Sequence, residues 1–159
     1  MKPRNILITV GVGTGAIAAW NYFSGLRKTS AELESINHIN IHKLDLKGLV
    51  IRVDVQLKNP TKTKLKIKFP FVKLIYKEVT IGSSQAVDRD ITIEKFSEAV
   101  AEKIMIEIPI RSIFSASAGM IKSLLNGETV KLNSKTTTTI DLGWKKIPYE
   151  KTEELILKK

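Results

Sequence analysis

The stretch LVIRVDVQLKNPTKTKLKIKFPFVKLIYK, residues 49–77, decides the fold of this 159-residue chain. From Leu49 onward, apolar residues alternate with mostly polar or charged residues, which is typical of a strand with one buried face and one largely solvated face. Asn59 and Pro60 interrupt this alternation, because proline cannot donate to a strand ladder and asparagine suits a turn. The alternation returns after Lys64, with lysines on one side and apolar residues on the other. The stretch therefore predicts two strands joined by an Asn-Pro turn.

The rest of the chain after residue 36 has the same two-residue period. It predicts further strands near 39–46 (with an irregularity between 41 and 44), 71–77, 79–81, 91–93 and 104–110, and a closing hairpin formed by 129–132 and 136–142. Pro109 indicates an edge position for its strand. Short strands with regularly spaced turn signals are typical of an antiparallel sandwich. The sequence therefore predicts a mainly β protein with a fibronectin- or immunoglobulin-like sandwich.

Residues 112–125 change from the strand period to a helical one. Ser112 could cap the start of this helix, and Asn126 with Gly127 could close its end. The expected apolar face of the helix comprises Ile113, Phe114, Ser117, Ile121, Leu124 and Leu125. We therefore expect one short helix docked on the sandwich.

The N-terminal segment carries no charge between Arg4 and Arg27. As a helix, residues 6–23 would span roughly 27 Å, close to the thickness of a bilayer's hydrocarbon core. The segment also offers a G-x-x-x-G pair for close helix packing and aromatic residues for a membrane interface. The anchor residues that we predict are Ile6, Leu7, Ile8, Val10, Gly11, Gly15, Ile17, Trp20, Tyr22 and Phe23.

Three other interpretations of this segment remain open. It could be a cleaved signal peptide, with Ala16-Ile17-Ala18 as the cleavage site. It could be a dinucleotide fingerprint, although such a motif needs a βαβ unit and the chain downstream resembles a β-meander. It could also be a helix packed inside a protein assembly rather than in lipid. We accordingly divide the chain into a hydrophobic helix at 1–27, a linker with helical character at 28–36, and a sandwich domain at 37–159.

Composition limits the chemistry of this chain. There is no cysteine, which excludes disulfides, thiolate metal sites and a cysteine nucleophile. His38 and His42 have no evident third metal ligand, and no catalytic arrangement or phosphate-binding loop is recognisable. We therefore expect a protein that is not an enzyme and uses no metal or cofactor.

The chain is strongly basic, with a formal net charge of +10. Such a balance suggests an anionic partner, although a soluble domain dispersed by self-repulsion is the plainer alternative. The candidate patch for anionic partners comprises Lys62, Lys64, Lys66 and Lys68, in a run without acids between Asp54 and Glu78. A solvated face that protects a sheet edge is the competing interpretation. Nucleic acid is not an expected partner, because Phe69, Phe71 and Tyr76 are predicted to be core residues rather than stacking platforms.

The order of these elements resembles the group-two late embryogenesis abundant (LEA) proteins, also called the WHy (water stress and hypersensitive response) domain family. The resemblance rests on VDVQLKNPT, on IKFPFVKLIYKEVTIGSS, on IMIEIPI with SIFSASAGMIKSLL, and on NGETVKLNSKTTTTIDLG. It spans roughly residues 36–147, and only Asn59-Pro60 is a sharp motif. The resemblance implies a fibronectin-like sandwich, often behind a hydrophobic anchor, with no catalytic residues and with protective or interaction roles.

Two functions follow from the sequence as expectations. The first is a non-catalytic structural or interaction sandwich, anchored at a membrane surface by residues 6–23. The second is a structural subunit of a large assembly such as a phage particle, in which the N-terminal helix packs against other subunits or is delivered to a membrane. In both cases we expect a homo-oligomer or a member of a larger complex.

Overall fold

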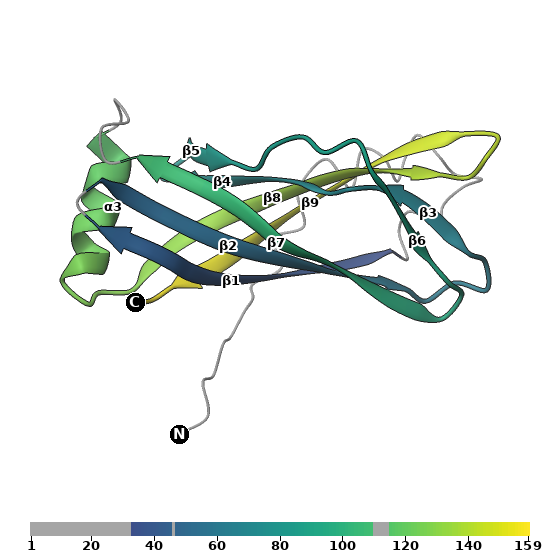
Figure 1. Cartoon of the computed structure of the whole chain (residues 1–159), viewed down its shortest axis with the longest axis horizontal. Helices are drawn as coiled ribbons and strands as arrows, with labels where there is room; N and C mark the ends of the chain where they lie inside the picture. Colours follow the sequence, from purple (N-terminus) through teal and green to yellow (C-terminus); the bar gives the residue numbers. More distant parts are fainter. Residues whose placement is uncertain (1–32, 46, 110–114) are drawn as a thin grey trace, which may run out of the picture.

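The strand that alternates from Leu49 to Leu57 lies at the centre of a three-stranded antiparallel sheet, in the order β1-β2-β7. The computed structural model describes residues 33–45, 47–109 and 115–159 (Figure 1). This sheet consists of β1 (Glu34–Asp45), β2 (Gly48–Asn59) and β7 (Ser97–Pro109). The alternate apolar side chains of β2 are at most 1% exposed. Pro109 ends β7 at the edge of this sheet, as predicted from its missing donor.

The remaining strands form a second antiparallel sheet that faces the first (Figure 1). Its members are β3 (Leu65–Lys68), β4 (Phe71–Tyr76), β5 (Val79–Ser83), β6 (Asp90–Ile93), β8 (Val130–Asp141) and β9 (Lys146–Leu157). One side of β8 pairs with both β3 and β4, and its other side pairs with β9. The buried side chains of both sheets form a single apolar core. The prediction of an antiparallel sandwich with a short helix is therefore confirmed.

The closing hairpin expected between 129–132 and 136–142 is wrong. Both segments belong to the single strand β8, whose hairpin partner is β9. The turn expected near Asn133 and Ser134 does not form, because Ser134 continues the inward-facing row of β8 and is fully buried. The structure therefore has one long terminal hairpin, β8–β9.

The N-terminal boundary of the sandwich also differs from expectation. The helical character expected for 28–36 is wrong where the structure describes it, because Glu34, Ser35 and Ile36 pair with β2 as part of β1. The irregularity expected between residues 41 and 44 is confirmed as a register shift between Ile41 and Lys43. Leu33 is buried in the core rather than lying on a helix face.

The predicted helix is present as α3 (Ser115–Leu125). Its C-terminus closes as expected: the N–H of Gly127 donates to Leu124 and the N–H of Glu128 donates to Ser123, with Gly127 at φ 79°. The inner face of α3 includes Met120 and Ile121. The expectation that Leu125 lies on that face is wrong, because 41% of Leu125 is exposed. The proposed cap Ser112 and residues Ile113 and Phe114 lie outside the described residues.

The two ends of the sandwich are different. At one end lie the start of β1 and three loops, 59–64, 94–97 and 142–145, and we call this the Asn-Pro end. At the other end lie α3, the β1–β2 turn and the C-terminus, and we call this the helix end (Figure 1). Across residues 33–45, 47–109 and 115–159, no helix is long and apolar enough to cross a membrane.

Candidate functional site

Lys64, directly before β3, and Lys66 and Lys68 on β3 form a lysine row. Its acidic partners lie elsewhere in the sequence. Lys64 pairs with Glu94 at 2.9 Å, and Lys66 pairs with Asp90 at 2.9 Å. Lys68 reaches Asp88 at 2.8 Å and Asp90 at 2.9 Å. Antiparallel pairing of β3 with β6 places this acidic row opposite the lysines.

These ion pairs affect protonation on the outer face of the sheet. Hydrogen bonds to Asp88 and Asp90 raise the pKa of Lys68, and the hydrogen bond to Asp90 raises that of Lys66. The hydrogen bond from Lys68, followed by that from Lys66, lowers the pKa of Asp90. The four lysines of the candidate patch are therefore not equivalent: three are matched by acids, whereas Lys62 forms no ion pair within the described chain.

The Asn-Pro motif is explained by a buried hydrogen-bond network. The Asn59 side chain is 1% exposed, and its Nδ2 donates to the carbonyls of Thr63 (2.7 Å), Ile93 (3.2 Å) and Glu94 (3.0 Å). Its Oδ1 accepts from the N–H and the hydroxyl of Thr61, at 3.0 and 2.6 Å. One side chain therefore joins the loop after β2 to the loop before β7. The motif has a structural role in addition to the turn preference read from the sequence.

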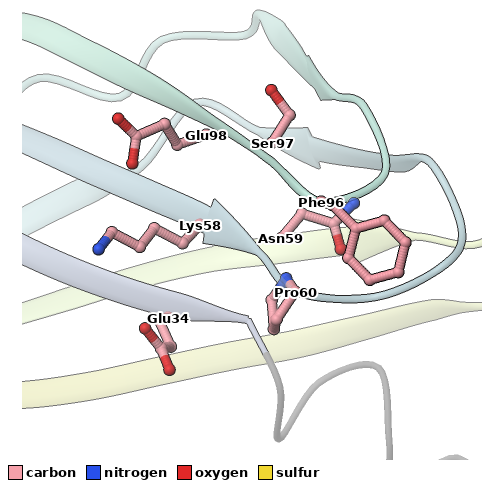
Figure 2. A pocket seen from close by; sticks show the side chains of 7 residues that line it. All are labelled: Glu34, Lys58, Asn59, Pro60, Phe96, Ser97 and Glu98. Atoms are coloured by element: carbon pink, nitrogen blue, oxygen red, sulfur yellow. The ribbon is translucent and has the colours of Figure 1, made fainter.

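A shallow open pocket of about 470 Å³ lies beside this network. Figure 2 shows the Phe96 ring next to Asn59 and Pro60, with the charged side chains of Glu34, Lys58 and Glu98 on the neighbouring strands. Glu98 accepts a hydrogen bond from Gln56 at 2.9 Å. The pocket thus combines an exposed aromatic ring with charges of both signs. Elsewhere in the described chain, too, no group of three acidic or histidine side chains could bind a metal.

A polar seam crosses the interior where β1 faces β8 and β9. Asn37 Nδ2 donates to Ser134 Oγ at 2.7 Å and to Thr136 Oγ1 at 2.8 Å, and all three residues are buried. The Asn37 backbone N–H donates to the Glu153 carboxylate at 3.0 Å. Thr136, in the segment 136–142 that we predicted as one arm of the closing hairpin, therefore contributes a bond between the two sheets.

The seam also contains an ion pair. Glu153 is 2% exposed and its Oε1 lies 2.6 Å from Lys151 Nζ, which also donates to the Ser35 carbonyl. The Ser35 hydroxyl lies 3.0 Å from the Tyr149 hydroxyl, and burial raises the pKa of Tyr149 despite that hydrogen bond. Every buried side-chain N or O atom in the described chain has a partner. This seam can fix the alignment of the two sheets, because its polar groups are satisfied only in this register.

Two exposed aromatic side chains at the Asn-Pro end were not predicted as site residues. Phe96 is 66% exposed and Trp144 is 74% exposed. Phe69 and Tyr76 pack partly against the core as expected, whereas the core assignment of Phe71 is wrong, because its ring is half-buried on the outer face beneath Lys73 Nζ at 5.8 Å. The signal for Phe96 and Trp144 was their position in loops between strands, where no partner face is available.

The predicted anchor residues, from Ile6 to Phe23, lie outside the described residues. The two histidines considered as metal ligands, His38 and His42, lie on β1 with exposed side chains. His38 Nε2 is 3.4 Å from Gln56 Oε1. The anchor therefore remains a prediction, as does the linker up to residue 32, whereas the sandwich begins with β1 at Glu34 and not at residue 37.

Comparisons with known proteins extend the fold assignment. No family model matches this sequence, and no curated protein matches it. A crystal structure of a protein from Archaeoglobus fulgidus is similar, with a TM-score of 0.53 and 12% identity over 80% of this chain and 97% of that chain. The solution structure of a protein from Arabidopsis thaliana gives a TM-score of 0.53 and 10% identity over 100% of this chain and 88% of that chain.

A third similar structure is a solution structure provisionally described as a late embryogenesis abundant protein. It has a TM-score of 0.48 and 15% identity, covering 92% of this chain and 83% of that chain. At these identities, the Archaeoglobus and Arabidopsis structures show a shared fold and leave function to be argued from this chain's own residues.

Proposed function

We propose that this chain is a non-catalytic β-sandwich interaction protein, held at a membrane surface by its N-terminal hydrophobic segment. The observation that carries the proposal is the uncharged run between Arg4 and Arg27, which is long enough to span a bilayer. The sandwich that follows has a closed apolar core. Such a domain suits binding or shielding through its surface.

The length of the connection supports this arrangement. Residues 24–33 separate Phe23, the end of the predicted membrane span, from the first residue of β1, Glu34. Ten residues reach at most roughly 35 Å when fully extended. A bilayer-spanning segment would therefore keep the sandwich next to the lipid headgroups.

We further propose that the chain is a divergent group-two LEA (WHy) protein. The support is the Asn59-Pro60 turn after an alternating strand, the late short helix and the closing strands, in the order expected of that family. The buried network of Asn59 gives a physical reason for this motif in such a sandwich. The proposed roles are protective or interaction roles at the membrane.

Flotation of the full-length protein with liposomes tests the membrane proposal. We expect the protein to float with vesicles and to remain bound after a high-salt wash. The variant Val10→Lys/Ile17→Lys should lose flotation, because each lysine at the centre of a membrane helix costs roughly 3 kcal/mol. The control Thr80→Lys/Thr129→Lys adds the same charge at exposed positions of the sandwich and should still float.

Two results would contradict the membrane proposal. One is a full-length protein that remains monomeric in buffer without detergent or vesicles. The other is a closed, lipid-free particle of many copies, which would instead support the assembly-subunit function.

A further inference from the structure

We infer that the Asn-Pro end of the sandwich docks on an anionic lipid surface, with Phe96 and Trp144 as interfacial anchors and Lys62, Lys95 and Lys146 as headgroup contacts. This inference rests on the proposed function and specifies which surface of the domain faces the bilayer. It assigns the two exposed aromatic side chains to one ligand, the headgroup region of an anionic membrane.

Strand register places these loops at the same end of the molecule. Glu34 at the start of β1 pairs with Lys58, and Asn59 pairs with Ser97 next to Phe96. In the second sheet, Asp141 pairs with Lys146 across the turn that contains Trp144. Figure 1 shows the β8–β9 turn, the β6–β7 loop and the β2–β3 loop at the end opposite α3.

The connection to the hydrophobic segment emerges at this end. The ten residues 24–33 reach at most roughly 35 Å, which is less than the roughly 40 Å that the twelve residues of β2 extend along the sandwich. If residues 6–23 span a bilayer, the Asn-Pro end lies nearer to the lipid than the helix end. Because the hydrophobic segment is attached at the Asn-Pro end, we assign the membrane as the partner of this surface.

Both aromatic residues are presented outward by local hydrogen bonds. Phe96 has a φ of 51°, and its N–H donates to the Thr61 carbonyl at 3.2 Å. The turn that contains Trp144 is closed by the Leu142 N–H, which donates to Lys145 at 2.9 Å. Tryptophan and phenylalanine rings bring apolar area to the interface, and tryptophan is enriched at the headgroup level. Within residues 33–45, 47–109 and 115–159, these are the exposed aromatic side chains.

The charges at this end complement an anionic surface. Lys62, Lys95 and Lys146 are exposed and form no ion pair with a described residue. Among the acids nearby, Glu94 pairs with Lys64, whereas Glu98 and Asp141 accept hydrogen bonds from neutral donors, the Gln56 side chain and the Gly143 N–H at 2.8 Å, and keep their negative charge. Glu34 also forms no ion pair with a described residue. Counted by formal charge, this end carries six lysines (Lys58, Lys62, Lys64, Lys95, Lys145 and Lys146) against four acids (Glu34, Glu94, Glu98 and Asp141), which leaves a net charge of +2.

Tryptophan fluorescence can test the docking separately from the tether, because the chain has two tryptophans, Trp20 and Trp144. In full-length Trp20→Phe, we expect Trp144 emission to shift to the blue and to be quenched by shallowly brominated lipids in phosphatidylcholine–phosphatidylserine vesicles. In pure phosphatidylcholine we expect a smaller shift. Trp144→Phe leaves Trp20 as the reporter of the tether.

Charge reversal provides the matched comparison. The variant Lys62→Glu/Lys95→Glu/Lys146→Glu, in the Trp20→Phe background, should lose Trp144 quenching, since each lysine near an anionic surface contributes about fivefold at low salt. The control Lys47→Glu/Lys122→Glu/Lys158→Glu makes the same change in net charge at the helix end and should retain the quenching.

The outcomes separate the two proposals. If Trp20 is quenched while Trp144 emission with vesicles equals its emission in lipid-free buffer, the docking inference is wrong and the tether stands. If Trp20 is not quenched, the proposed tether is wrong. Equal Trp144 quenching in neutral vesicles or in both triple variants would overturn the role of charge. A blue shift without lipid that grows with protein concentration would identify a second copy as the partner and overturn the inference.

Discussion

Replacing Asn59 with alanine should lower the free energy of unfolding by about 2–4 kcal/mol, because roughly two buried polar groups lose their partners. The side chain makes five hydrogen bonds: three through Nδ2, to Thr63, Ile93 and Glu94, and two through Oδ1, from Thr61. Nδ2 carries only two protons, so its three contacts share two donors. Water can reach the exposed Thr63 after the change. The Ile93 carbonyl and the Thr61 N–H are buried, and these are the two groups that would lose their partners.

Urea unfolding of the full-length protein, followed by far-ultraviolet circular dichroism, measures this effect. Asn40→Ala removes an exposed asparagine from β1 and should change stability by less than about 0.5 kcal/mol. Asn59→Asp should be at least as harmful as Asn59→Ala at neutral pH, because it replaces both donors with a carboxylate that faces carbonyl oxygens. If Asn59→Ala matches Asn40→Ala, the network does not hold the two loops together and the reasoning fails.

Other changes test the seam, the surface pairs and the strand turn. Glu153→Ala should cost about 2–4 kcal/mol by leaving Lys151 unpaired, and Glu153→Met/Lys151→Met should recover only part of it, because the Asn37 N–H and the Ser35 carbonyl stay without these partners; a double variant as unstable as the single one would contradict this. The pKa of Asp90 is lowered on folding, so its contribution is present above the unfolded pKa and is lost as pH falls through the folded pKa. Asp90→Asn should therefore be less stable than the parent at neutral pH and equal to it in acid, whereas a gap that persists in acid would refute the ion-pair explanation. Gly48→Ala should cost more than about 2 kcal/mol in urea unfolding, because its Cβ would lie 2.5 Å from a β7 carbonyl oxygen; Gly127→Ala, which has open space, should cost about 1 kcal/mol, and equal losses would argue against this close approach.

Local patterns predicted the elements whose burial follows from neighbouring residues. The β2 alternation succeeded because every inward residue from Leu49 to Leu57 is apolar. The end of α3 succeeded because Asn126 and Gly127 carry a local closing signal. The expected burial of Leu125 was wrong, because a helical period does not specify how wide a face of the helix the sandwich covers.

The errors arose where burial depends on distant residues. Ser134 and Thr136 are polar, and their partner Asn37 lies about a hundred residues away, so their inward direction could not be read from β8 alone. The lysine row similarly has no acid close to it in the sequence. Its acidic partners lie on or beside β6, which pairs with β3 only in the fold. The alternation of Asp88, Asp90 and Glu94 was the available signal for those ion pairs.

Hydrogen exchange of the full-length protein in anionic nanodiscs tests the central claim, that the Asn-Pro end of a tethered sandwich faces the bilayer. Relative to the protein in neutral nanodiscs, we predict slower exchange in the loops 59–64, 94–97 and 142–145, with no change at the β1–β2 turn or in α3. Protection at the helix end, or no protection in any of the three loops, would contradict the claim.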